Sequence, residues 1–221
     1  MSPAFLLWRV CMSDYKTVKE FGADEFTEKR SRFIGYCSPV KTQQEAVEFI
    51  EKIKSKHWDA KHNVYAYILR DGGVKRYSDD GEPQGTAGVP VLEVIQKSGL
   101  TDVAVVVTRY FGGILLGAGG LVRAYSHGAK IALEAAKPVM MVLCDCCTLS
   151  CSYDKYGKVS SLLFGGGAVV DETGFTDSVN IRFHLKKGYI DKINEELKAM
   201  SSGQLTAEVE SEAYFMSEIE K

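Results

Sequence analysis

The segment VAVVVTRYFGGILLGAGGLVRAYSHGAKIALEAAK, residues 103–137, restricts the possible folds more than any other part of the chain. It begins with an apolar, β-branched run, 103–110, which is typical of a strand buried on both faces of a sheet. A glycine-rich stretch follows, and the spacing of apolar residues from Leu121 on predicts a long helix that ends before Pro138. A strand, a glycine-rich loop and a helix in this order require a domain that combines helices with a sheet.

Composition and charge narrow the class of protein. The chain has 221 residues, of which 45% are hydrophobic and 25% charged, as in an ordinary globular protein of one large or two small domains. The normal apolar fraction excludes disorder, the lack of a three-residue glycine period excludes collagen, and the lack of a persistent heptad excludes coiled coil. The net charge of -2 hides an uneven distribution, with 19 basic and 16 acidic side chains up to Lys137 but 8 and 13 from Pro138 on.

The remaining elements of the first part, 12–137, follow from periodicity and from turn residues. Strands are predicted at 33–40, 63–70 and 74–77, with a tight turn at Asp71, Gly72 and Gly73 between the last two. Helices are predicted at 43–60 and 90–98. We therefore expect an α+β domain or a mixed two-layer sandwich.

The second part, 138–221, contains a compact series of elements. Its pattern predicts a strand at 140–152, a helix at 153–164, strands at 168–172 and 178–186, a helix at 189–200 and a last strand at 204–210. The order βαββαβ is the ferredoxin-like arrangement, so we expect an α+β domain of this kind and a domain boundary near Pro138.

No apolar run approaches the roughly 20 residues that a membrane-spanning helix needs, and the first residues lack the pattern of a secretory signal. The segment that begins at Met12 is typical of the start of a protein, so we expect residues 1–11 to be a disordered extension. Without a membrane span or a secretory signal, we expect the protein to be cytoplasmic. Four of the six cysteines fall in MVLCDCCTLSC, a predicted buried strand. Their spacing favours reduced, packed thiols over a metal site.

The glycine-rich loop is the strongest candidate for a ligand site. Glycines allow backbone amides to face a ligand, and the amino terminus of a helix favours anions. Two arginines flank the loop and can contact phosphate or carboxylate. The candidate phosphate-binding residues are Arg109, Gly112, Gly113, Gly117, Gly119, Gly120 and Arg123. The spacing fits neither GxGxxG nor GxxxxGK[ST], and close packing of the helix on the sheet explains the glycines equally well.

An acidic loop, DDGEPQGTAG at 79–88, precedes the second predicted helix. Its candidate ligand-facing residues are Asp79, Asp80, Glu82, Gly85 and Thr86. The carboxylates can hold a hydrated Mg²⁺ beside a phosphate, or can simply cap the helix and satisfy turn amides. His62, Asp80 and Glu82 are candidates for acid–base catalysis, although no nucleophile accompanies them, and the other histidines are not spaced as metal ligands.

Basic and aromatic residues suggest nucleic acid as a second type of ligand. The basic candidates are Lys29, Arg30, Arg32, Lys52, Lys54, Lys56, Lys75 and Arg76, and the candidates for base stacking are Tyr65, Tyr67 and Tyr77. A solvated helix face and the apolar side of a sheet explain the same residues. The charge of the first part, +3, is also smaller than is usual for nucleic-acid binders.

The two motifs DDGEPQGTAG at 79–88 and VVVTRYFGGILLGAGGLVRAY at 105–125, with AKHNVYAY at 60–67, resemble the signature of the YigZ/IMPACT family. The resemblance extends over essentially everything after Met12. It implies a first domain like ribosomal protein S5 domain 2 and a ferredoxin-like second domain similar to the last domain of elongation factor G. Eukaryotic members of the family are translational regulators that carry an additional amino-terminal RWD domain, for which this chain has no room.

These observations predict a cytoplasmic regulator of translation or stress response, not primarily an enzyme, that binds RNA, ribosomes or translation factors through its first domain. The alternative is a small-molecule enzyme that acts on a nucleotide or phosphorylated metabolite. No membrane partner is expected, and no cofactor apart from Mg²⁺ in the case of a phosphate ligand. The sequence does not determine the oligomeric state.

Overall fold

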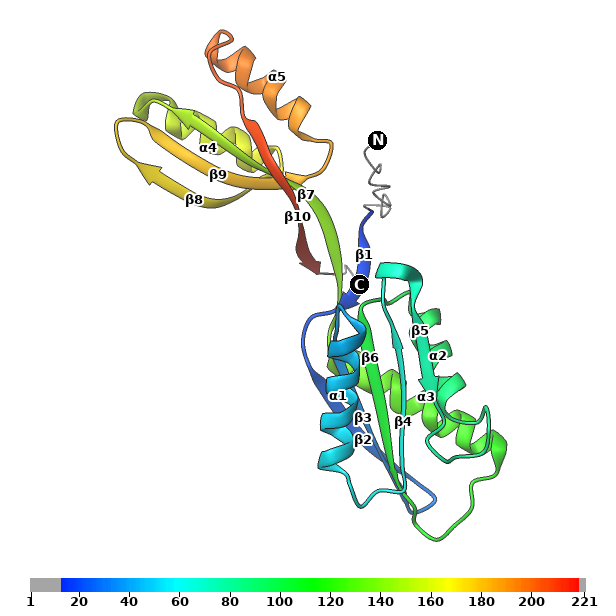
Figure 1. The fold of residues 1–221 in the computed structure, drawn as a ribbon. Coiled ribbons are helices and arrows are strands. Elements are labelled where there is room, and N and C mark those ends of the chain that lie inside the picture. The colour runs from blue at the N-terminus through cyan, green and yellow to red at the C-terminus, as the bar shows by residue number, and fades with distance from the viewer. Residues whose placement is uncertain (1–12, 219–221) are drawn as a thin grey trace, which may run out of the picture. The chain divides into compact units, whose positions relative to one another are not determined.

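A computed structural model describes residues 13–218. The predicted disordered extension, 1–11, lies outside the described residues. The chain divides into two compact units, the first comprising mainly Tyr15–Met140 and the second mainly Met141–Ser217 (Figure 1). Each unit has its own sheet and its own apolar core, and each is described separately below.

The first unit contains a five-stranded antiparallel sheet of order β2-β3-β6-β4-β5. Its strands are β2 (Gly22–Glu28), β3 (Ser31–Pro39), β4 (His62–Ile68), β5 (Lys75–Ser78) and β6 (Val103–Tyr110). The central strand, β6, is buried along nearly its whole length, as its apolar run predicted. The turn between β4 and β5 is a short 3-10 helix, η1 (Asp71–Gly73).

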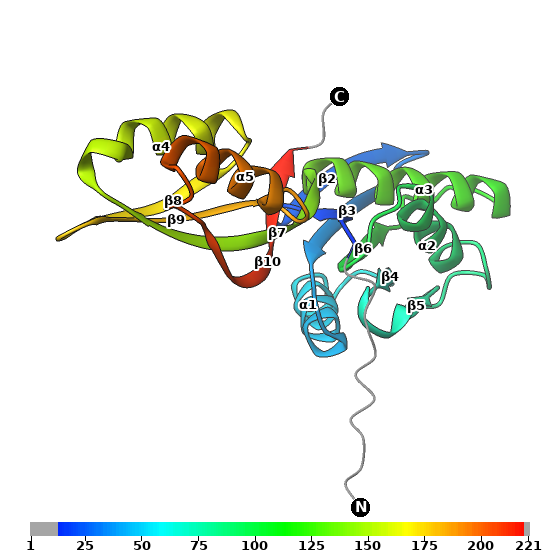
Figure 2. The ribbon, with the colours of Figure 1, turned by 90° about the horizontal axis from the view of Figure 1, so that it is seen from above.

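Three helices cover both faces of this sheet (Figures 1 and 2). They are α1 (Gln43–Lys56), α2 (Gly88–Lys97) and α3 (Ala118–Ala135). Alternate residues of each strand point to opposite faces, so Ile34 packs against α1 whereas Phe33 packs in the core with α2 and α3. The unit therefore has three layers and not the two of a two-layer sandwich, because β3 and β6 are apolar on both faces.

The sequence pattern missed the first two strands, β1 (Tyr15–Val18) and β2. β1 is short and pairs with β7 (Pro138–Cys151). β2 is an exposed edge strand of sequence GADEFTE, in which the glycine, the alanine and the three acidic residues have low β-propensity. It forms because tertiary contacts stabilise it: Phe26 stacks on Phe33 with ring centroids 5.1 Å apart, and a side chain at Gly22 would overlap the backbone at Ala136.

The second unit has the element order β7, α4 (Tyr153–Gly165), β8 (Val169–Phe175), β9 (Val179–Lys186), α5 (Ile190–Ser201) and β10 (Glu208–Glu218). The βαββαβ order predicted from the sequence is confirmed. Its strands lie in the order β10-β7-β9-β8. Apolar residues of both helices pack with those of β7 and β9 in one core, which leaves the other face of the sheet uncovered by helices (Figure 1).

The last strand begins later than predicted, at Glu208 and not at residue 204. The preceding residues bond to helix α5 and not to a strand. Asn194 accepts from the backbone N–H of Ala207 at 2.8 Å and donates to its carbonyl oxygen at 3.1 Å. Ser201 Oγ accepts from the N–H of Leu205 at 2.9 Å. These side chains form the hydrogen bonds that the backbone of a strand would otherwise form with a neighbouring strand.

The cysteines of the described part of the chain are free thiols. Most of those on β7 are buried, and burial raises the pKa of Cys147 to about 12, so this thiol is not activated. Cys11 lies outside the described residues. Among helices within residues 13–218, none is long and apolar enough to cross a membrane.

Candidate functional site

Arg109, at the end of β6, lies in the protein interior. The residue is only 5% exposed, and its Nη1 donates to Glu82 Oε1 at 2.6 Å. Tyr125 of α3 donates to the same carboxylate oxygen at 2.7 Å, and burial raises the pKa of its phenol. Arg109 Nε has no partner among the described residues. A phosphate at Arg109 would therefore have to compete with the carboxylate of Glu82.

Asp79 acts as the cap of helix α2. Its Oδ1 accepts from the backbone N–H groups of Ala87 and Gly88, at 3.1 and 2.8 Å, and its Oδ2 accepts from Gly85 at 2.9 Å. Thr86 closes the same turn by donating to the Pro83 carbonyl at 2.6 Å. For these residues the structure supports the capping interpretation of the acidic loop.

Asp80 and His62 connect the acidic loop to β4. Asp80 accepts from the backbone N–H of Asn63 at 2.7 Å and from Lys54 Nζ at 3.3 Å. His62 Nδ1 lies 2.8 Å from the Asp80 carbonyl oxygen, which can only accept, so Nδ1 carries the proton. The other ring nitrogen lies 3.9 Å from Glu82 Oε1. The structure thus brings His62, Asp80 and Glu82 together, with both carboxylates already bonded within the protein.

The glycines of the β6–α3 loop serve two different purposes. A Cβ at Gly112 would overlap the backbone of Arg30, and the Gly112 N–H donates to Ser31 Oγ at 3.2 Å, so this glycine is required by packing. Gly113 and Gly117 have positive φ angles of 86° and 70°. Gly119 has open space where a side chain would lie. Packing therefore explains Gly112, whereas the exposed glycines leave the amino terminus of α3 accessible.

The β2–β3 turn, which packs on Gly112, has an unusual backbone. Lys29 and Arg30 both lie in the left-handed region, with φ angles of 44° and 65°. Such turns normally contain Asn-Gly or other residues that tolerate positive φ. Two adjacent long basic residues in this conformation are strained by an amount on the order of 1 kcal/mol each. Strain of this kind is characteristic of functional positions.

Arg123, in the first turns of α3, lies beside this hairpin. It is exposed and lines a cavity of about 470 Å³ together with Lys29, Gly120 and His127. Glu28 is the carboxylate among the lining residues. Of the two arginines predicted to bind an anion, Arg123 therefore faces solvent whereas Arg109 does not.

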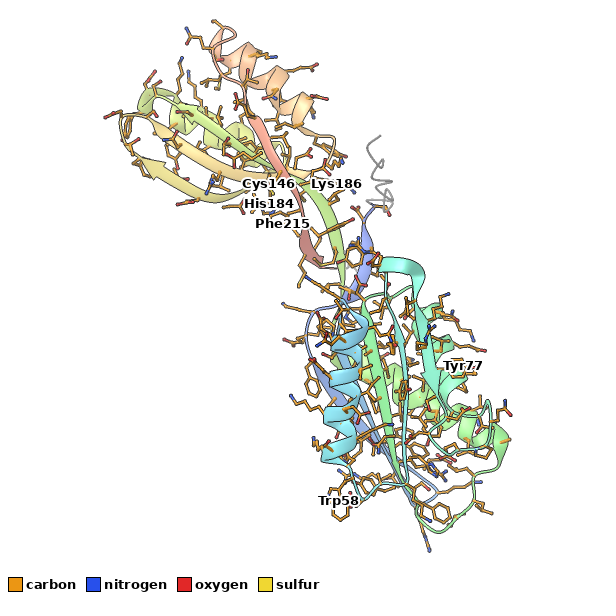
Figure 3. All side chains as sticks on the ribbon, in the orientation of Figure 1. Trp58, Tyr77, Cys146, His184, Lys186 and Phe215 are labelled. Atoms are coloured by element: carbon orange, nitrogen blue, oxygen red, sulfur yellow. The ribbon has the colours of Figure 1, made fainter. Side chains whose placement is uncertain are left out.

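Exposed aromatic and apolar side chains accompany these cations. Trp58, on the segment between α1 and β4, is 83% exposed, and Phe111 and Leu115 of the β6–α3 loop are 47% and 83% exposed. Figure 3 shows Trp58 at the same end of the first unit as the β2–β3 turn and the β6–α3 loop. We call this the loop surface: residues 28–31, 57–61 and 111–120 with Arg123.

The sequence patterns did not point to Trp58. A signal was nevertheless present, because Trp58 lies beyond the apolar residues of α1 that face the core. Among the tyrosines predicted to stack on bases, Tyr67 is buried in the core and Tyr65 is partly buried, whereas Tyr77 is 49% exposed (Figure 3). Lys54 is paired with Asp80. The basic residues of the sequence therefore do not form one face, and the loop surface contains only part of them.

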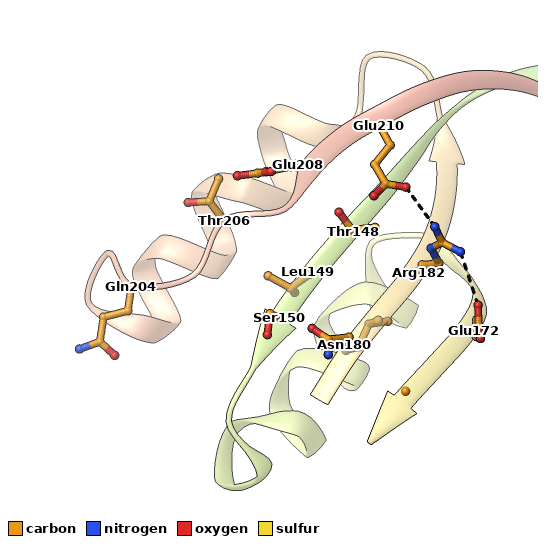
Figure 4. Close-up of a pocket in the computed structure, with 12 residues that line it drawn as sticks. Thr148, Leu149, Ser150, Glu172, Asn180, Arg182, Gln204, Thr206, Glu208 and Glu210 are labelled. Carbon is orange, nitrogen blue, oxygen red and sulfur yellow. Dashed lines mark ion pairs between the residues drawn. The ribbon is translucent and has the colours of Figure 1, made fainter. Parts of the chain in front are cut away.

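The second unit has a groove of about 590 Å³ on the face of its sheet that helices do not cover. Arg182 lies between Glu172 and Glu210, with a nitrogen 3.7 Å from an oxygen of each carboxylate (Figure 4). Glu208 lines the same groove and has no ion-pair partner among the described residues. Three carboxylates and one guanidinium make this groove acidic, so it does not suit a phosphate backbone. Within residues 13–218, no group of three or more His, Cys, Asp or Glu side chains is placed to hold a metal ion.

Comparisons with known proteins identify the family. The Impact N-terminal domain matches residues 29–133, and a domain of unknown function, DUF1949, matches residues 149–204. The IMPACT family member YvyE of Bacillus subtilis is 40% identical over 194 residues, which cover 87% of this chain and 89% of that protein. The IMPACT family member YigZ of Escherichia coli is 33% identical over 80% of this chain and 88% of that protein.

A eukaryotic relative and a solved structure show how far the similarity extends. A Dictyostelium discoideum IMPACT homolog is 37% identical over 46% of this chain but only 29% of that protein. A crystal structure of a hypothetical protein has a TM-score of 0.58 and 30% identity, and covers 90% of this chain and 98% of that one. The Impact N-terminal domain contains nearly all of the loop surface. This chain belongs to the IMPACT family.

Proposed function

We propose that this protein binds single-stranded RNA through the loop surface of its first unit, and that it acts on translation or the stress response by this means. The observation that carries the proposal is the combination of strained, exposed Lys29 and Arg30 with the exposed aromatic ring of Trp58 at one end of one domain.

Phosphate contacts are supported by charge and by backbone geometry. Lys29, Arg30 and Arg123 are exposed cations around the amino terminus of α3, where the first N–H groups of the helix and its dipole favour anions. Gly119 leaves room for a phosphate to approach this backbone. Lysine and arginine contacts of this type supply most of the affinity of nonspecific RNA binding.

Base contacts are supported by the aromatic rings. Trp58 and Phe111 project from separate loops, and a hydrogen bond connects the two loops because Tyr110 donates to Asp59 Oδ1 at 2.9 Å. A base stacked on an aromatic ring gains roughly 1–3 kcal/mol, and any base can stack. A largely exposed tryptophan at the same end of the unit as these cations therefore favours single-stranded RNA over a duplex, whose bases are already stacked.

The finer fold assignments agree with this function. The family resemblance implies that the first unit is like ribosomal protein S5 domain 2 and that the second is ferredoxin-like, and the strand order β10-β7-β9-β8 supports the second assignment. Domains of both kinds occur in translation factors, so ribosomal RNA is the natural source of the single strand. This part of the proposal rests on fold analogy.

The test compares the wild-type protein with Trp58→Ala for binding to fluorescent oligouridine at low salt. We expect the substitution to weaken binding about tenfold or more, as loss of one stacked base does. Phe164→Ala removes an aromatic ring that is 85% exposed on the second unit and serves as the matched control. Equal binding by Trp58→Ala and Phe164→Ala would contradict the proposal.

A further inference from the structure

A chain of hydrogen-bonded side chains lies on the α1 face of the first unit. His57, which is 8% exposed, occupies its centre. Its Nε2 lies 2.7 Å from the hydroxyl of Tyr36, and its Nδ1 lies 2.8 Å from that of Tyr110. Tyr110 bonds onward to Asp59 at 2.9 Å, and Lys56 Nζ bonds to the Tyr36 hydroxyl at 3.4 Å. Both ring nitrogens of one buried histidine therefore bond to tyrosines.

The direction of every bond in this chain follows from its two ends. The Asp59 carboxylate can only accept, so Tyr110 donates to it and accepts from His57 Nδ1. Burial lowers the pKa of His57, which is therefore neutral near pH 7, and Nε2 accepts from Tyr36. The oxygen of Tyr36 is then left as an acceptor, which Lys56 uses. All the protons point from Lys56 toward Asp59.

The Tyr36 end of the chain opens into a cleft of about 380 Å³, lined also by Ala23, Glu25, Arg32 and Lys56. Arg32 and Glu25 form an ion pair and neutralise one another. Asp24 also lines the cleft, but it pairs with Gly35 in the sheet, and the alternation of side chains along β2 places its carboxylate on the opposite face.

The unpaired charge in this cleft is positive. Lys56 has no carboxylate partner among the described residues, and its Nζ lies 4.9 Å from the centre of the Tyr36 ring. A cleft with one free ammonium group, a phenol and a buried imidazole is suited to a small oxyanion.

We propose that this cleft binds a small oxyanion of the sulfate or phosphate type through Lys56 and Tyr36, and that protonation of His57 tightens the binding. The cleft is lined by none of the residues proposed above to contact RNA, which are Lys29, Arg30, Trp58, Phe111 and Arg123, although His57 also belongs to segment 57–61 of the loop surface. The inference does not depend on the RNA-binding function.

Protonation of His57 acts by reversing one hydrogen bond. Nε2 then carries a proton and donates to the oxygen of Tyr36, so the hydroxyl proton of Tyr36 turns toward the cleft. The cleft gains a donor and a nearby positive charge at the same time. Besides burial, Lys56 and Arg32 oppose protonation of His57 whereas Asp59 favours it. The change therefore occurs below the ordinary histidine value of about 6.5.

The test uses sulfate, whose charge does not change between about pH 4.5 and pH 8, and follows the backbone and imidazole signals of Lys56 and His57 by NMR. We expect sulfate to bind about tenfold more tightly when His57 is protonated than when it is neutral, as a charged hydrogen bond predicts. His57→Gln retains an amide that cannot titrate, and we expect it to remove this pH dependence. Tyr36→Phe removes only the hydroxyl and tests the same point if His57→Gln does not fold.

The matched pair Lys56→Met and Lys52→Met separates this cleft from other cations. Lys52 is exposed one turn earlier on α1 and does not line the cleft. We expect Lys56→Met to weaken sulfate binding at every pH and Lys52→Met to leave it unchanged. Equal effects of the two substitutions, equal affinity for both forms of His57, or a His57 ring that stays neutral down to acid unfolding would each overturn the proposal.

Discussion

Arg109 and Glu82 form a buried ion pair, with 2.6 Å between Nη1 and Oε1, that joins strand β6 to the acidic loop before α2. The two residues lie in sequence motifs that suggested a phosphate site and a magnesium site. In the structure each supplies the charge that the other needs. The pair therefore fixes the loop against the sheet and directs ligand binding to residues that remain exposed.

This arrangement predicts a large effect of Arg109 on stability. Removing one member of a buried pair leaves an uncompensated charge, which costs about 3–5 kcal/mol. We expect Arg109→Met to lower the free energy of unfolding in urea by about this amount. Tyr125→Phe removes one hydrogen bond from the same carboxylate and should cost about 1 kcal/mol. A stable Arg109→Met protein that had lost only RNA binding would show that Arg109 contacts the ligand instead.

The glycines predict a contrast between two substitutions in the same loop. Gly112→Ala places a methyl group against the backbone of Arg30 and should destabilise the protein by about 2 kcal/mol or more. Gly119→Ala meets no atom and should leave stability unchanged or slightly higher. If phosphate approaches the amino terminus of α3, Gly119→Ala should nevertheless weaken oligouridine binding. Unchanged binding would limit the role of these glycines to packing.

We expect substitutions in the β2–β3 turn to raise the stability of the protein and to weaken its binding to RNA. Replacing Lys29 and Arg30 by Asn and Gly supplies residues that accept positive φ, so the double variant should be more stable by about 1 kcal/mol. It also removes two cations from the loop surface and should weaken RNA binding. Thermal unfolding and oligouridine titration measure the two effects on the same protein. A variant that is more stable and binds RNA equally well would contradict a functional origin of the strain.

His57 predicts a dependence of stability on pH. Because burial lowers its pKa in the folded protein, the unfolded chain binds a proton more readily, and stability is lost as pH falls below about 6.5. The loss continues until the folded protein also binds the proton, at up to about 1.4 kcal/mol per pH unit. Urea unfolding of wild type and His57→Gln at a series of pH values isolates this contribution. Identical slopes for the two proteins would show that His57 titrates normally.

Local patterns predicted much of the fold. Strand β6, the glycine-rich loop and helix α3 could be predicted because each has its own pattern in consecutive residues of the sequence. The element order of the second unit could be predicted in the same way, one element at a time. Strand β2 could not be found in this way because contacts with Phe33 and α3 stabilise it, and not its own composition. The start of β10 was misplaced because Asn194, from a helix, bonds the backbone before it.

The candidate site was less predictable because it depends on contacts between distant residues. The role of Arg109 is determined by Glu82, which lies 27 residues earlier in the chain, and that of Asp79 by the amides it caps. Trp58 follows an amphipathic helix, and only the structure shows that its ring is exposed at the same end of the first unit as the β2–β3 turn. Residue type alone did not separate the exposed Arg123 from the buried Arg109.

The salt dependence of oligouridine binding by wild type and Arg123→Gln tests the central claim most directly. Each phosphate contact to a single strand contributes about -0.7 to the slope of log K against log salt concentration, so Lys29, Arg30 and Arg123 together should give about -2. We expect Arg123→Gln to reduce the magnitude of this slope by about 0.7, whereas Lys130→Gln, an exposed lysine on the same helix, should leave it unchanged. Binding that is absent, independent of salt, or equally affected by the two substitutions would contradict RNA recognition by the loop surface.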